Sequence, residues 1–190
     1  MQGKIFEGDY KTRCKNIDSL LCVGDTFDML KREIRLGDRH AVFYMIDGFL
    51  KGEVLEKIME FFLSLAPEDV PETYEDFLKK CTPYGDIVTV TTEQDFLHYV
   101  LSGLTGFVVE GYDEILVIDL RDYPSRSVEE PDKDKVLRGS RDGFVEAIMP
   151  NIALIRRRIR DVDLKFEIYS IGSSSRTDIS VVYMKDRVNQ

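Results

Sequence analysis

Hydrophobic and polar positions in the first quarter of the chain follow the pattern of β-strands. Residues 26–36 and 40–46 are separated by a Gly-Asp-Arg turn at 37–39, and the run AVFYMI at 41–46 is rich in residues that favour strands. The two segments are therefore predicted to pair as an antiparallel hairpin.

Three further strand segments follow in the middle of the chain. Residues 86–90 form a short one, whereas GFVVE at 106–110 and EILVIDL at 114–120 flank a Gly-Tyr-Asp turn at 111–113. Near-continuous apolar character is typical of strands that are covered on both faces. The segments 106–110 and 114–120 are therefore predicted to be central strands of the sheet.

Helical periodicity separates these strands. In residues 54–62 the apolar side chains share one helical face and the charged ones the other, which predicts a helix that covers a sheet. A short helix is predicted within 9–22, and an acidic, proline-containing loop with one short helix within 66–84. Thr92 stands three residues before an aspartate, a spacing that predicts the start of a helix over 92–101.

The C-terminal third contains a long helical pattern that a proline interrupts. Its apolar positions recur at spacings of four or three and are predicted to be core; they are Phe144, Ile148, Ile152, Ile155 and Ile159. Pro150 lacks a backbone donor and its ring clashes with the carbonyl four residues earlier, so a kink or two abutting helices are predicted. Alternation at 164–169 and 179–183, around Gly-Ser-Ser-Ser at 172–175, predicts a second hairpin.

Alternating strands and helices, with covered central strands, indicate an α/β layered domain. Because two hairpins are predicted, the sheet is expected to be a mixed β-sheet flanked by helices, not a purely parallel one. The chain has 190 residues, of which 43% are hydrophobic, enough for one real core and at most two small ones. Residues 1–190 are therefore predicted to form a single α/β domain.

Charge and cysteine content narrow the class of protein. The formal net charge of −9 disfavours nonspecific binding to nucleic acid or to an anionic membrane surface, so no nucleic-acid partner is predicted. The N-terminus has no apolar segment of the signal or anchor type, and AVFYMI is far shorter than the roughly 20 residues that span a bilayer. Three cysteines without a CxxC spacing argue against a secreted disulfide framework and indicate a reducing compartment.

Few residues are of the kinds that carry catalysis or hold a metal. His40 and His98 stand alone in apolar surroundings, where a packing role is expected rather than metal ligation, so no metal site and no cofactor are predicted. Neither GxGxxG nor GxxxxGK[ST] occurs. Acidic residues follow the segment 114–120, where α/β proteins often place ligand sites, so a metal-dependent hydrolase stays an alternative to a solvated loop. These acids are Asp119, Asp122, Glu129 and Glu130.

The segment RGSRDG at 138–143 precedes the long helical pattern. Backbone N–H groups at a helix start and two guanidinium groups could converge there on an anion. The same arginines could equally pair with Glu129, Glu130 or Glu146. Both readings stay open from the residues alone.

Four arginines occupy five positions at the end of the same pattern. They are Arg156, Arg157, Arg158 and Arg160. One or two of them complement the negative pole of a helix C-terminus. At about 100° per residue the four cannot all face one way, so some are expected to face the sheet or a partner.

The run YPSRSVEEPDKDKVLRGSRDGFVEAIMPNIALIRRRIRD at 123–161 holds these features in a characteristic order. An RS-hydrophobic-EEP element precedes RG-x-R-D-GF, an asparagine and an IRRRI helix, and the run resembles the signature of the spore germinant-receptor A-subunit family. The matching residues are Arg126, Ser127, Glu129, Glu130, Pro131, Arg138, Gly139, Arg141, Gly143, Phe144, Asn151, Arg156, Arg157 and Arg158. The similarity covers 100–186, and residues 23–59 resemble one branch of the family. Pro150 departs from the helix-compatible residue expected there.

The resemblance implies an interaction and signal-coupling domain, not an enzyme. It would be the first N-terminal subdomain of a longer membrane protein, on the cytoplasmic side of the spore inner membrane, with other subunits of a germination complex as partners. The chain itself contains no predicted membrane span. A small-ligand domain for a nutrient or anion is the alternative. The residues expected to contact a partner or an anion are Arg126, Glu129, Glu130, Arg138, Gly139, Arg141, Arg156, Arg157 and Arg158.

Overall fold

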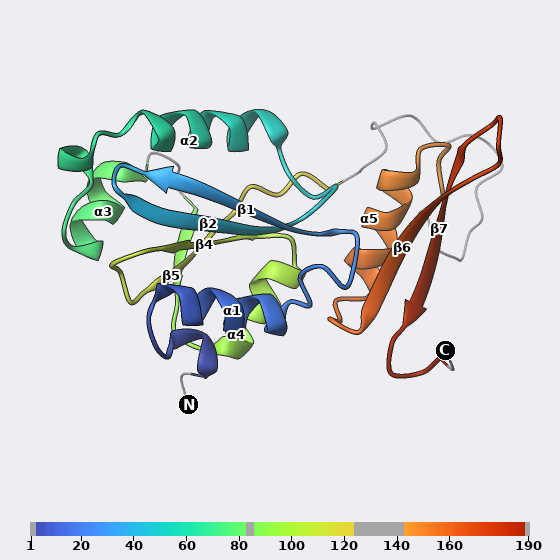
Figure 1. Cartoon of the computed structure of the whole chain (residues 1–190), viewed down its shortest axis with the longest axis horizontal. Coiled ribbons are helices and arrows are strands. Elements are labelled where there is room, and N and C mark those ends of the chain that lie inside the picture. The colour runs from blue at the N-terminus through green and yellow to red at the C-terminus, as the bar shows by residue number, and fades with distance from the viewer. Residues whose placement is uncertain (1–2, 83–85, 124–142, 189–190) are drawn as a thin grey trace, which may run out of the picture.

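The computed structural model describes residues 3–82, 86–123 and 143–188, and Figure 1 shows their arrangement. Residues up to 123 form the larger part, called here the sheet unit, around a five-stranded sheet with the order β1-β2-β4-β5-β3. The strands are β1 (Met29–Leu36), β2 (Arg39–Ile46), β3 (Ile87–Val90), β4 (Thr105–Val109) and β5 (Ile115–Ile118). Strands β4 and β5 are central and entirely buried, as predicted for them.

Helices cover both faces of this sheet. On one face lie α1 (Tyr10–Leu20), preceded by η1 (Lys4–Phe6), and α4 (Glu93–Leu101). On the other lie α2 (Gly52–Ser64) and α3 (Tyr74–Cys81), with η2 (Pro67–Asp69) between them. Figure 1 shows α2 on the opposite side of the strands from α1 and α4. The predicted helices within 9–22, 54–62, 66–84 and 92–101 are thus present.

Each face of the sheet buries its own core. Adjacent residues of β2 point to opposite faces, so Tyr44 packs with α1 and α4 while Phe43 packs with α2 and α3. Phe43 stacks on Phe107 with ring centroids 4.4 Å apart, and Phe62 of α2 stacks on the same ring at 5.1 Å. This aromatic stack fixes α2 over the centre of the sheet.

The layered α/β class is confirmed, but the expected mixed pairing of strands is wrong. Every pairing between the named strands is antiparallel. The expectation combined the alternation of strands and helices, which is typical of parallel pairing, with two antiparallel hairpins. Here β4 and β5 are continuously apolar because helices cover both faces of an antiparallel sheet.

The C-terminal residues 143–188 form a smaller part, called here the hairpin unit. It contains α5 (Ile148–Arg158) and the antiparallel hairpin β6 (Leu164–Ile171) and β7 (Thr177–Met184). The second predicted hairpin is confirmed, yet it forms its own two-stranded sheet beside the sheet unit (Figure 1). A third, small core lies between α5 and the hairpin and includes Ile152, Leu164 and Phe166.

Pro150 neither kinks nor splits the long helix, and that prediction is wrong. The helix begins at Ile148, so Pro150 occupies its first turn, where a backbone N–H has no partner within the helix. The apolar stripe is correspondingly shorter than predicted. Ile152 is buried, whereas Phe144 before the helix is 71% exposed and Ile159 after it is 40% exposed.

Asn151 holds the chain that enters this helix. Its side-chain oxygen accepts a hydrogen bond from Val145 N at 2.8 Å, and its amide nitrogen donates to Val145 O at 2.7 Å. One side chain thereby replaces the missing helical partners of the segment before Ile148.

Both histidines are exposed, so the packing role expected for them is wrong. His40 stacks on Tyr10 at the end of the β1–β2 hairpin, with ring centroids 6.4 Å apart, and His98 lies on the outer face of α4. Cys14, Cys22 and Cys81 are free. Among the described residues, no helix has the length and hydropathy to cross a bilayer.

Candidate functional site

Three of the predicted contact residues fall within the described part of the chain, on the last turn of α5: Arg156, Arg157 and Arg158. The others lie outside the described residues, and so do residues 138–142 of the proposed anion site at 138–143. They are Arg126, Glu129, Glu130, Arg138, Gly139 and Arg141.

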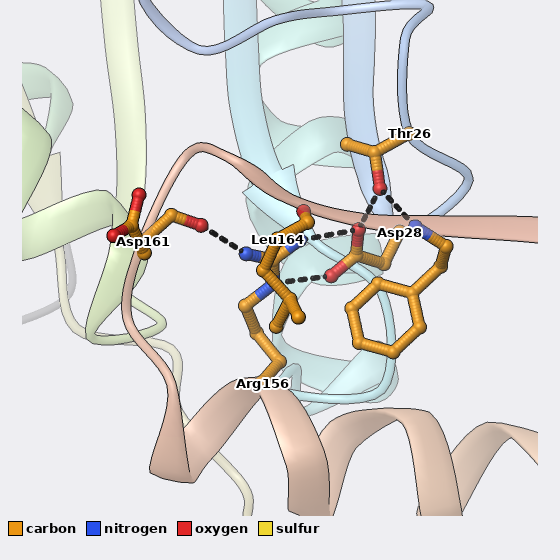
Figure 2. A network of polar contacts seen from close by, with 6 residues as sticks. Thr26, Asp28, Arg156, Asp161 and Leu164 are labelled. Atoms are coloured by element: carbon orange, nitrogen blue, oxygen red, sulfur yellow. Dashed lines mark hydrogen bonds and ion pairs between the residues drawn. The ribbon is translucent and has the colours of Figure 1, made fainter. Parts of the chain in front are cut away.

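Arg156 points inward and forms a buried ion pair with Asp28. Its Nε donates to Asp28 Oδ2 at 2.6 Å and its Nη2 donates to Asp28 Oδ1 at 3.0 Å, as Figure 2 shows. The side chain of Arg156 is 1% exposed and that of Asp28 is 0% exposed. Such two-point pairing of a guanidinium with a carboxylate is the strongest class of protein hydrogen bond.

The remaining donors and acceptors of this pair are also used. Arg156 Nη1 donates to Asp161 O at 2.6 Å and Nη2 donates to Leu164 O at 2.8 Å. Thr26 Oγ1 donates to Asp28 Oδ1 at 2.7 Å and accepts from Phe166 N at 3.1 Å. A buried charge pair is tolerated when its other hydrogen-bonding groups are satisfied in this way.

The Arg156–Asp28 pair joins the two units of the fold. Asp28 lies just before β1 in the sheet unit, and Arg156 lies on α5 in the hairpin unit. Phe27 N also donates to Phe166 O at 2.9 Å, so the segment before β1 runs beside β6. Arg156 is thus an internal structural residue, and its predicted role in contacting a partner is wrong.

Gly48 allows α5 to approach the sheet unit. It follows β2 with φ +82°, and a Cβ added there would lie 3.1 Å from Ala153 Cβ. Ala153 is fully buried in the core that α1 and α4 share. The close approach therefore depends on two small side chains facing each other.

Arg157 and Arg158 are exposed. The guanidinium carbon of Arg157 lies 4.5 Å from the centroid of the Tyr123 ring, a cation–π contact. Arg158 comes one position later on the helix, about 100° further round. The helical rotation therefore separates one internal arginine from two on the surface, as the spacing of the four arginines required.

Arg160 follows the helix and contacts the sheet unit. Its Nη1 donates to Ser102 Oγ at 3.1 Å, while Tyr123 Oη donates to Ser102 O at 2.5 Å. The guanidinium carbon of Arg121 also lies near Tyr123, 5.9 Å from the centroid of its ring. Sequence reasoning singled out neither Ser102 nor Tyr123, because nothing local marks them.

A cavity of about 420 Å³ opens beside these arginines. Its described lining residues are Asp86, Ile87, Val88, His98, Tyr99, Ser102, Leu104, Asp119, Arg121 and Arg160. Asp119 Oδ1 accepts from Arg121 Nε at 2.8 Å, and these hydrogen bonds hold the pKa of Asp119 below its usual value. The walls carry both signs of charge, and the negative pole of α4 adds to the acidic side.

Asp119 is paired with Arg121, and this pairing weakens the metal-dependent hydrolase alternative. Both oxygens of its carboxylate face the Arg121 guanidinium. Within the ranges that the structure describes, no three metal-ligating side chains come together. Asp122 is exposed nearby, and Glu129 and Glu130 lie outside those ranges.

Comparison with known proteins shows which protein family this chain resembles. Residues 17–190 match the family described as the Bacillus/Clostridium GerA spore germination protein. Stage V sporulation protein AF of Bacillus subtilis is 36% identical over 166 residues, which are 86% of this chain and 34% of that protein. Spore germination protein KA of the same organism is 27% identical over 168 residues, 86% of this chain and 31% of that protein.

A solved structure shares the fold. The N-terminal domain of the A subunit of the Bacillus megaterium spore germinant receptor GerK3 superposes with a TM-score of 0.68 at 19% identity, covering 96% of this chain and 67% of that one. The chain spans about a third of the length of these two curated relatives. The match over residues 17–190 and the 36% identity identify the chain as a member of the GerA family of spore germination proteins.

Proposed function

We propose that this chain is an interaction and signal-coupling domain of a spore germination membrane protein. In this proposal residues 1–190 are a single domain, the first N-terminal subdomain of a longer protein in the spore inner membrane, and the domain lies on the cytoplasmic side. Its partners are other subunits of a germination complex. Membership of the GerA family and the short span of the relatives that the chain covers support this view.

The division of the arginines on α5 is the observation that carries the proposal. Arg157 and Arg158 are exposed on the helix surface, and the adjacent Arg156 joins the helix to Asp28 in the sheet unit. A contact made at the surface of α5 therefore acts on a helix of the hairpin unit that is bonded to the sheet unit through Arg156 and Asp28. This is the arrangement that a coupling element requires.

Charge reversal at Arg157 in the full-length protein tests this proposal. We expect Arg157→Glu to weaken recovery of the complex from spore membranes and to slow germination, because an exposed cation at the contact becomes an anion. The 190-residue chain with the same substitution should keep its circular dichroism spectrum and lose no more than about 1 kcal/mol of stability, the scale of one exposed cation–π contact.

Arg32→Glu is the matched control, because Arg32 is an exposed arginine on β1, away from α5. It makes the same change in net charge and should leave assembly and germination at wild-type levels. Normal germination of spores that carry Arg157→Glu would refute the proposal. Equal loss in both variants would show an effect of net charge alone.

Binding of a small molecule is the second candidate function, and the cavity beside Ser102 favours it. Walls of both charges, with apolar side chains such as Leu104, suit a small molecule that carries a carboxylate together with a hydrogen-bond donor. Ligand-observed NMR with nutrients, nucleotides and phosphate tests this, with Arg160→Gln as the variant expected to lose binding. No binding at millimolar concentration removes this candidate.

A further inference from the structure

The hairpin unit exposes more large hydrophobic side chains than the rest of the described fold. Twelve large hydrophobic side chains are exposed among the described residues, and eight of them lie between positions 144 and 188. These eight are Phe144, Val145, Ile159, Tyr169, Ile171, Ile179, Val181 and Val188. The sheet unit, which is much longer, contributes the other four. The hairpin unit is therefore the incompletely covered part of the structure.

Four of the eight gather on one face of the hairpin. Side chains of β6 alternate between the face that packs on α5, with Phe166 and Ile168, and the outward face. Tyr169 and Ile171 lie on the outward face of β6, and the register places Ile179 opposite Tyr169. Val181 is the next outward residue of β7. Their exposed fractions are 47% for Tyr169, 53% for Ile171, 41% for Ile179 and 45% for Val181.

The same face is buried near the start of β6 and exposed toward the hairpin turn. Lys165 is the first outward residue of β6 and is 1% exposed. Glu167 comes next and accepts hydrogen bonds from Tyr169 Oη and, at 2.6 Å, from Tyr183 Oη. Val181 lies opposite Glu167 in the register, and the other three exposed apolar residues lie nearer the hairpin turn. The exposed area is thus a defined patch of four side chains rather than scattered surface residues.

A two-stranded sheet with a helix on one face is small for an independent structure. Hairpins generally need a third strand or cover on their apolar faces to be stable in water. The solved GerK3 domain has the same fold over 96% of this chain, yet the match takes up only 67% of that domain. A domain of this fold therefore has room for additional chain beyond the part described by residues 1–190.

We propose that the outward patch Tyr169, Ile171, Ile179 and Val181 is covered by a further segment of the same polypeptide, an apolar strand or helix from the part of the N-terminal domain that residues 1–190 do not span. This inference rests on the proposed function only in its premise that the chain is the first part of a longer protein. The outer half of the hairpin is then an internal surface of the complete domain. Arg157 and Arg158 lie on α5, outside this patch.

Cysteine accessibility compares the two forms of the protein directly. Ile179→Cys is placed in a Cys22→Ser background, since the other native thiols, Cys14 and Cys81, are buried. Maleimide labelling is followed in the 190-residue chain and in the full-length protein in lipid nanodiscs. We expect labelling at position 179 to be at least about tenfold slower in the full-length protein, because the site must open before it reacts.

Leu63→Cys is the matched control, because Leu63 is 58% exposed on α2 in the sheet unit. It should label at the same rate in both forms. Val181→Cys provides a second patch position and is expected to behave as Ile179→Cys does, so the result does not depend on the folding of one variant.

Three outcomes would overturn the inference. Equal rates at position 179 in both forms, whether fast or slow, would show that no further segment covers the patch. Protection in the 190-residue chain that increases with protein concentration would assign the patch to a second copy. Protection of the full-length protein that requires co-purified subunits would assign it to a partner. Labelling is measured without germination, so a failed germination assay for Arg157→Glu and a failed labelling assay are separate results.

Discussion

Removal of the buried Arg156 guanidinium is expected to destabilise the chain strongly. Arg156→Met keeps an unbranched apolar side chain but leaves the Asp28 carboxylate, which is 0% exposed, with Thr26 Oγ1 as its remaining side-chain donor. The carbonyls of Asp161 and Leu164 lose a donor as well. Breaking a buried ion pair from one side costs about 3–5 kcal/mol. For a chain of this length that corresponds to a fall in Tm of about 6–20 °C.

Urea unfolding of the 190-residue chain, followed by circular dichroism, measures this loss. Arg157→Met is the matched control, because it removes a neighbouring exposed guanidinium whose contact with Tyr123 is worth about 0.5–1 kcal/mol. Its unfolding midpoint should stay close to that of the wild type. Arg156→Met should lower the midpoint with an unchanged urea dependence, since the surface exposed on unfolding is the same.

A double-mutant cycle with Asp28→Asn identifies the pair as the cause. Asp28→Asn alone leaves Arg156 buried without its counter-ion and is expected to cost about as much as Arg156→Met. The double variant removes both charges, so its loss should fall short of the sum by at least about 2 kcal/mol. Additive losses, or a loss below about 1 kcal/mol for Arg156→Met, would refute the assignment of this pair as the link between the two units.

Two further variants test other contacts. Lys165→Met should raise the free energy of unfolding by about 1–3 kcal/mol, because Lys165 Nζ is buried without a hydrogen-bond partner among the described residues. The exposed Lys57→Met is its control, and a lower free energy of unfolding for Lys165→Met would contradict the reasoning. Asp119→Asn should be less stable than the wild type at neutral pH. Hydrogen bonds from Arg121 lower the pKa of Asp119 below 3.8, so its contribution is present above that pH and is lost as pH falls through the lower, folded-state pKa. A stability difference that stays constant down to pH 2 would contradict this.

The segments with strong periodicity were predictable because their information is local. The β1–β2 hairpin, the covered strands β4 and β5 and the β6–β7 hairpin all agree with the alternation or continuity of apolar residues in the sequence. Helix α4 likewise begins after Thr92, whose Oγ1 accepts from Asp95 N at 3.1 Å. Each of these signals lies within one element and its immediate neighbours.

Two errors arose where a local pattern has more than one structural solution. Continuous apolar strands are compatible with any sheet whose two faces are covered, so they did not reveal the antiparallel direction of the pairing. The helical pattern around Pro150 did not reveal where the helix starts. Once Ile148 is the first residue of α5, the proline lies where it removes no helical hydrogen bond.

The arginines of α5 show most clearly which features can be read from the sequence and which depend on tertiary structure. The sequence by itself determined that four arginines within five positions could not share one face, and its motifs pointed to the family. Only the tertiary structure decided that Arg156 is the internal one, because its partner Asp28 lies 128 residues away in the chain. Helical rotation is a property of successive residues and can be read locally. The choice of a buried counter-ion depends on which distant segments pack together, and no periodicity encodes that.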